Sequence, residues 1–218
     1  TQDRPYNRVP NFHELNRGKK GITLNLMHPE AKEAFLRLVR KSDVVIENFS
    51  SRVMHNFGLD YDVLREEKSD LIMVSMPAFG STGPMANRIS FGPGIDALSG
   101  MNHLTGFPDG VPTKPGHVLG DFNAGLSAAY TVMMALMAKR RTGKGQRIEI
   151  SMREGQTFLI GEYLVAESMN QRSPGRQGNR HSSMAPHGVY PCRGEDAWLA
   201  LAIDSDEQWQ RLRTVLGD

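Results

Sequence analysis

Residues 71–76 read Leu-Ile-Met-Val-Ser-Met, an apolar run that ends at Pro77. An earlier run, Val44-Val45-Ile46, has the same character, and residues 62–68 between the two have a helical pattern. Short apolar runs without polar alternation are typical of strands that are buried on both faces of a sheet. Strand, helix and strand in this order predict an α/β fold with a parallel, Rossmann-like sheet.

The flanking sequence extends this pattern in both directions. We expect an irregular entry over residues 1–20, and a helix over residues 31–41 that begins at His28-Pro29-Glu30, where Pro suits the first turn and Glu the positive helix end. Further elements are expected as a strand over 21–26, a short helix near 53–57, a strand over 146–151 and one helix over 153–169. Ligands of such sheets bind beyond the carboxyl ends of the strands, which makes residues 47–51 and 77–83 candidate binding loops.

A loop-rich stretch, residues 79–116, separates this sheet from the next helix and holds eight of the 22 glycines and five of the 12 prolines. A loop of this length is usually either functional or disordered. Apolar residues are spread through it, so we expect it to be ordered.

The carboxyl-terminal part differs in composition. Residues 170–183 are polar and predict a linker, whereas residues 184–218 predict the beginning of a small α/β domain, with β-like runs at 188–190 and 198–203 and a helix at 206–216. Residues 1–169 are then part of a large domain. The chain begins with Thr1 and stops just after its last helix, so we expect it to be part of a longer protein.

Bulk composition excludes several function classes. The 218 residues carry a formal net charge of +2, so no nucleic-acid partner is indicated. There is no apolar run of about 18 residues, so no membrane partner is expected either. The single cysteine, Cys192, rules out an internal disulfide framework and favours a reducing compartment, here predicted to be the cytoplasm.

The most informative acid lies in residues 116–129, which read GHVLGDFNAGLSAA. Asp121 stands between Gly120 and a run of small and apolar residues, a position that favours a helix N-cap. A carboxylate at a helix start is kept ionised by the free N–H groups and the helix dipole, and an ionised carboxylate can also act as a nucleophile. Gly120 would let a bulky electrophile approach the backbone. The residues alone leave cap and catalyst open.

Other motifs give weaker signals. The seven histidines show no metal-binding spacing, and we predict no metal site. The basic run Lys139–Arg147 lacks the frame of a phosphate-binding P-loop, and Gly92-Pro93-Gly94 lacks the third glycine of a dinucleotide fingerprint.

Several segments, taken in order, resemble one family. They are residues 16–26, the strand end 43–49, Phe57-Gly58-Leu59-Asp60-Tyr61, Gly120-Asp121, residues 142–146 and residues 185–190. Each is weak alone, but their order and spacing resemble the class III CoA-transferases, a family whose related branch contains the 2-methylacyl-CoA racemases.

The resemblance implies a CoA-transferase that uses CoA thioesters as substrates, with no tightly bound cofactor. It implies that Asp121 is catalytic and attacks an acyl-CoA donor to form an aspartyl anhydride, then an aspartyl-CoA thioester, before a carboxylic acid acceptor is activated. It also implies an interlocked homodimer, a βα unit before Asn16 that is missing here, and a small domain that continues beyond Asp218.

The resemblance further implies CoA contacts in three segments. They are Leu24, Asn25, Leu26 and Met27; Asn48, Phe49 and Ser50; and Arg88, Ile89, Ser90 and Phe91. The chain departs from the family where Ser50-Ser51 replaces a frequent Arg-Pro or Gly-Pro pair, and where Asn56 replaces an arginine of some transferases.

Two alternatives to a transferase remain. A racemase needs a proton-transfer group on each side of Cα, but Phe91 occupies the position of the racemase histidine and cannot move a proton. A CoA-binding protein without turnover is the other alternative, and Asp121 argues against it.

Overall fold

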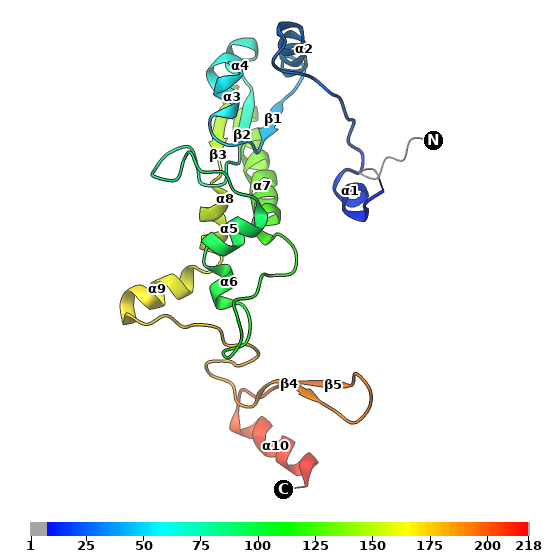
Figure 1. Ribbon diagram of the computed structural model, residues 1–218, viewed down its shortest axis with the longest axis vertical. Coiled ribbons are helices and arrows are strands. Elements are labelled where there is room, and N and C mark those ends of the chain that lie inside the picture. The colour runs from blue at the N-terminus through cyan, green and yellow to red at the C-terminus, as the bar shows by residue number, and fades with distance from the viewer. Residues whose placement is uncertain (1–7, 218) are drawn as a thin grey trace.

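The computed structural model describes residues 8–217, a mixed α/β chain that is elongated along one axis (Figure 1). One end holds a three-stranded sheet with α2 (Pro29–Val39), α3 (Val53–Asn56) and α4 (Tyr61–Glu67). The other end holds the hairpin β4–β5 (His187–Pro191 and Trp198–Ala202) and α10 (Asp206–Leu216).

The sheet confirms the predicted parallel arrangement. Its order is β1 (Val44–Glu47), β2 (Ile72–Ser75) and β3 (Gln146–Glu149), with β2 in the centre and all pairs parallel. All four residues of β2 are buried. Because β2 is covered on both faces, it reads as an unbroken apolar run rather than an alternating one.

The two faces of the sheet have separate cores. Leu71 and Met73 pack with Val39, Met54 and Leu64 beneath α2–α4. The alternate residues Ile72 and Val74 point the other way and pack against α7 (Leu119–Thr142) through Ala128 and Ala135. Because successive side chains of β2 point to opposite faces of the sheet, this one strand packs against helices on both sides.

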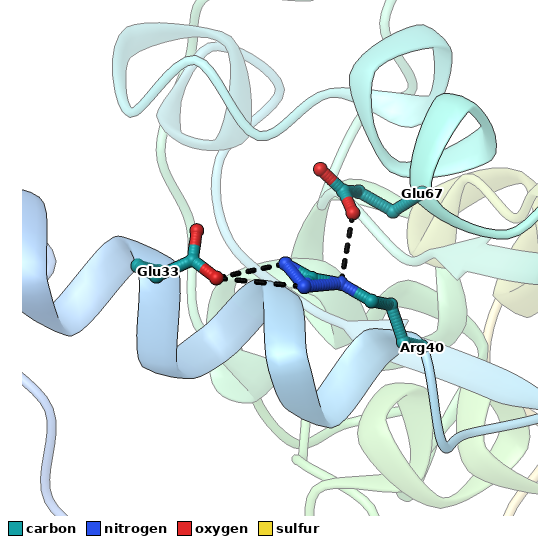
Figure 2. Close-up of polar contacts among 3 residues, drawn as sticks. All are labelled: Glu33, Arg40 and Glu67. Carbon is teal, nitrogen blue, oxygen red and sulfur yellow. Dashed lines mark hydrogen bonds and ion pairs between the residues drawn. The ribbon is translucent and has the colours of Figure 1, made fainter.

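Arg40, just after α2, ties two of the helices that cover the first face (Figure 2). Its Nε lies 2.9 Å from Glu67 Oε2 on α4, and its Nη2 lies 2.8 Å from Glu33 Oε1 on α2. The guanidinium bridges two carboxylates, which fixes the relative position of α2 and α4 at the surface.

Several predicted elements differ in the structure. The predicted strand over residues 21–26 is not formed: residues 21–25 have no regular secondary structure and Leu26 begins a turn, because an alternating pattern by itself supplies no neighbouring strand to pair with. The predicted irregular entry contains the six-residue helix α1 (Pro10–Leu15), while residues 1–7 lie outside the described part. The loop-rich stretch contains α5 (Gly92–Leu98) and α6 (Met101–Leu104).

The predicted helix over 153–169 is broken into α8 (Met152–Phe158) and α9 (Gly161–Asn170). The break buries Ile160, whose Cδ1 would lie 3.1 Å from a Cβ placed on Gly100. The hairpin β4–β5 and α10 form close to their predicted positions.

An ion-pair network at the carboxyl end of α7 predicts a pH effect on stability. Lys139 Nζ lies 2.8 Å from Asp70 Oδ2 and 3.1 Å from Asp43 Oδ1. Hydrogen bonds from Lys139 and Lys68 lower the pKa of Asp70 to about 2. Because this pKa is depressed, the stabilisation is present above the unfolded-state value near 3.8 and is lost as pH falls toward 2.

Lys139→Met should therefore lower the free energy of unfolding at pH 7 by about 1 kcal/mol, a value reduced because Asp70 is one-third exposed. It should also flatten the loss of stability between pH 4 and pH 2. Urea denaturation at several pH values measures both effects. Lys144→Met is the control, and equal acid sensitivity of both variants would contradict the assignment.

Candidate active site

Asp121 lies in the first turn of α7, at the third helical residue, and not at the N-cap. The cap prediction is wrong: Val118 holds the N-cap position and makes no side-chain cap. The helix starts three residues earlier than predicted, and its second residue, Gly120, packs on α5, where a Cβ would lie 2.7 Å from Ile95 Cγ2. Gly120 is thus required for close helix packing, which corrects its expected role as an opening for the substrate.

Asp121 is exposed as a residue, but its carboxylate is partly buried against α5, and it lines a cavity of about 510 Å³. Its Oδ2 lies against α5, since a Cβ on Gly92 would be 2.6 Å from it. The cavity is lined by Asn48, Phe49, Ser50, Val53, Ala78, Arg88, Ile89, Ser90, Phe91, Gly92, Pro93, Asp121 and Met152.

The cavity is formed where the strands end. Asn48 follows β1, Ala78 follows β2 and Met152 follows β3. In a parallel sheet these carboxyl ends share one edge, so loops far apart in sequence meet there. The structure brings together Asp121 and two of the three predicted CoA-contact segments.

The third predicted segment, Leu24–Met27, lies outside this cavity. Leu24 lines a separate depression with residues of α2 and of the turn after it, among them Arg37 and Lys41. Leu26 packs at the edge of the core, and Met27 is exposed. Asn25 Oδ1 accepts a hydrogen bond from the Met27 N–H at 3.1 Å, a local turn.

Partial burial, and secondly the charge of Asp96, raise the pKa of Asp121 above its ordinary value. This direction is opposite to the one expected from the helix dipole. A carboxylate in this position holds a proton more tightly than an exposed aspartate does.

Arg88 is the cation of the cavity wall, and its side chain is exposed. Phe91, which the resemblance places at the position of the racemase histidine, is 81% exposed and lines the same cavity. His103 is turned elsewhere, with Nε2 3.2 Å from Ser173 Oγ, and the His117 ring contacts Phe122 edge-on.

The loop that carries Arg88–Phe91 is anchored by hydrogen bonds in its first part, residues 78–86. Glu149 Oε1 accepts the N–H of Ser81 at 2.7 Å, and the Arg153 N–H donates to the Ala78 carbonyl at 3.0 Å. Ser51 Oγ donates to the Ala86 carbonyl at 2.7 Å, which joins this loop to the 48–51 loop. A proline at position 51, which the resemblance would lead one to expect, has no hydroxyl that could make this bond.

If the cavity binds the CoA thioester that the resemblance implies, Ser51→Ala should raise its KM about three- to tenfold, because two walls of the cavity lose a bond worth about 1 kcal/mol. Steady-state kinetics measure this. Ser42→Ala, which removes a comparable 2.8 Å hydroxyl bond to the Leu38 carbonyl away from the cavity, is the control and should leave KM unchanged. An unchanged KM in Ser51→Ala would show that the bond does not shape the site.

Within residues 8–217, no helix is long and apolar enough to cross a membrane. The same residues contain no group of three His, Cys, Asp or Glu side chains placed to hold a metal ion.

Sequence reasoning missed two buried polar side chains behind the site. Asp96 on α5 and Gln156 on α8 are both fully buried. A single acid within the otherwise small and apolar helix sequence of α5 was the one signal that could have identified Asp96.

The chain is similar in sequence to known CoA-transferases over most of its length. The chain is 36% identical over 206 residues to the succinate–glutarate CoA-transferase of Agrobacterium fabrum, with 94% of this chain and 51% of that protein covered. It is 37% identical over 207 residues to the acetyl-CoA:oxalate CoA-transferase of Acetobacter aceti, with 94% and 53% covered. The chain thus spans about half the length of the curated relatives it matches.

The crystal structure of a CaiB/BaiF family protein from Brucella suis superposes with a TM-score of 0.86 at 35% identity, and covers 94% of this chain and 54% of that one. The sequence pattern described as CoA-transferase family III matches residues 2–218. The chain therefore belongs to CoA-transferase family III.

Proposed function

We propose that the protein transfers CoA from an acyl-CoA thioester to a carboxylic acid, with Asp121 as the nucleophile. The observation that carries this proposal is the position of the Asp121 carboxylate in one cavity with Asn48–Ser50 and Arg88–Phe91. The relatives named above are CoA-transferases, and their names make small dicarboxylic acids the first acceptors to assay.

The proposed chemistry proceeds through two anhydrides. Asp121 attacks the donor carbonyl, and CoA thiolate leaves to give an aspartyl anhydride. The thiolate then attacks the aspartyl carbonyl, which releases the donor acid and forms an aspartyl-CoA thioester. The acceptor carboxylate displaces CoA thiolate to form a second anhydride, and attack of the thiolate on the acceptor carbonyl yields the new thioester and free Asp121.

Arg88 is the residue in the described cavity that can neutralise a substrate anion. It can hold a phosphate of CoA, as the resemblance implies, or the distal carboxylate of a dicarboxylic acid. The backbone N–H groups of the glycine-rich loops supply donors for the oxyanion of each tetrahedral intermediate.

The experiment is to trap the aspartyl intermediate. The protein is incubated with succinyl-CoA or acetyl-CoA and hydroxylamine, and mass spectrometry of peptides identifies any hydroxamate. A hydroxamate at Asp121, with transfer to oxalate, succinate or glutarate, supports the proposal. Binding without an adduct would indicate a CoA-binding protein, and deuterium exchange at Cα of a 2-methylacyl-CoA would indicate a racemase.

The interlocked homodimer belongs to the same proposal. One face of α7 is buried, but the opposite face exposes a row of large apolar residues: Phe122, Leu126, Tyr130, Met133 and Met137. An apolar surface of this kind supports coverage by further protein. Limited proteolysis tests the proposed division into a large domain, a linker at 170–183 and a small domain from 184, and light scattering after gel filtration tests the proposed dimer. A monomer would contradict it.

A further inference from the structure

Asp96 is the most unusual side chain near the cavity. It is fully buried on α5, its Oδ1 accepts the N–H of Gly120 at 2.9 Å, and its Oδ2 has no hydrogen-bond partner among the described residues. Burial of a carboxylate is costly unless it is paired, so its presence between two helices needs a functional or structural reason.

The hydrogen bond of Asp96 satisfies a group that the helix itself leaves unpaired. Gly120 is the second residue of α7, and the first four N–H groups of a helix have no partner within the helix. The N-cap residue of α7, Val118, makes no side-chain hydrogen bond to the helix, and Asp96 on α5 takes over the capping role from 24 positions before Gly120.

The same stretch of α5 also contacts the nucleophile. Gly92 lies one turn before Asp96, and its Cα is so close to Asp121 that a Cβ would lie 2.6 Å from Oδ2. Ile95 packs equally closely on Gly120, since a Cβ on Gly120 would lie 2.7 Å from Ile95 Cγ2. Residues 92, 95 and 96 therefore fix both Gly120 and the carboxylate that follows it.

On the basis of the proposed function, we propose that Asp96 is a positioning residue for Asp121, which caps the first turn of α7 from the neighbouring helix and places a negative charge behind the nucleophile. The consequence is chemical as well as structural. After burial, Asp96 is the cause that raises the pKa of Asp121. A nucleophile with a higher pKa is intrinsically stronger as long as it remains deprotonated.

Other charged or titratable groups lie on the elements around this end of α7. They are Arg88 in the loop before α5, His117 just before α7, and Arg153 and Glu154 on α8. The Arg153 guanidinium is directed to Met85 Sδ, at 3.5 Å, and Glu154 is exposed. None of these four groups is a cause of the raised pKa of Asp121. The charge that raises it is that of Asp96.

The test uses the full chain and two variants, with readouts that need no substrate. Asp96→Asn keeps an oxygen that can accept the Gly120 N–H but removes the charge, whereas Asp96→Ala removes both. NMR of the Asp121 carboxyl carbon, assigned by its loss in Asp121→Asn, follows the titration, and hydrogen exchange reports on the Gly120 amide.

We expect the pKa of Asp121 to fall in both variants, because a repulsive charge is gone. We expect Gly120 to exchange at least about tenfold faster in Asp96→Ala and at an unchanged rate in Asp96→Asn. The control is Asp43→Asn, which removes a carboxylate paired with Lys139, about 27 Å along α7 from Asp121, and should change neither readout.

The proposal is overturned if Asp121 titrates at the same pH in Asp96→Asn as in the unchanged chain, or if Gly120 is equally protected in Asp96→Ala. Where Asp96→Ala does not fold, the titration of Asp96→Asn decides alone. Since neither readout involves turnover, failure of the proposed CoA transfer is recognised separately, by the absence of the hydroxamate at Asp121. In an active enzyme, the acid limb of kcat/KM should shift to lower pH in Asp96→Asn.

Discussion

Replacing Asp121 by Asn should reduce CoA transfer by at least about a thousandfold, because the reaction proposed here has no covalent route without this carboxylate. Asp121 is exposed as a residue and makes no side-chain cap of α7, so its loss should not unfold the protein. The measurement is steady-state transfer between a CoA thioester and a dicarboxylic acid, together with the melting temperature.

A matched control separates chemistry from charge. Asp109→Asn removes an exposed carboxylate outside the cavity and should retain full activity. Binding of CoA to Asp121→Asn should also be retained, because Asn48–Ser50 and Arg88–Phe91 are unchanged. Transfer by Asp121→Asn within tenfold of the unchanged protein would rule out Asp121 as the nucleophile.

Gly145→Ala should destabilise the fold by about 3 kcal/mol or more, the largest stability effect expected from a single methyl group in this chain. Gly145 precedes β3, and a Cβ on it would overlap the carbonyl oxygen of Leu71 and lie 2.6 Å from the carbonyl carbon of Asp70. Both atoms belong to the backbone leading into β2, so neither can move without opening the sheet.

Gly143 provides the comparison, two residues earlier in the same turn. It ends α7 in the left-handed region, at φ 69°, with open space around a Cβ. Gly143→Ala should therefore cost only about 1 kcal/mol, from backbone strain alone. Urea denaturation followed by circular dichroism measures the stability of both variants. Equal midpoints would show that the close contact of Gly145 with the backbone before β2 is not the reason for a glycine at position 145.

The turn at residues 142–146 shows which features the sequence explains and which need the structure. Residues 142–146 were notable in the sequence for their resemblance to a family segment, with no reason attached to the individual glycines. The structure gives two different reasons, a helix end at Gly143 and a backbone contact at Gly145. Only the second depends on a strand that lies about 70 residues away in the sequence.

Asp121 illustrates the same division at the site. The residue and the helix behind it were predictable, because glycine, an acid and a run of small residues are local signals. The start of the helix was not, because it depends on Ile95 and Asp96 from another helix. The local pattern therefore suggested a cap where the structure has a helical residue capped from elsewhere.

The sequence by itself determined the alternation of strands and helices in a parallel sheet, the family and the nucleophile candidate. The signals for these features are the spacing of apolar residues, the turn residues and the order of the motifs, and all of them are local in the sequence. The tertiary structure decided that residues 21–26 pair with no described strand, that the helix after β3 breaks at Ile160, and that three strand ends meet in one cavity beside Asp121. It also decided that Asp96 is buried behind the nucleophile. These features depend on contacts between residues distant in sequence, and such contacts exist only after the chain has folded.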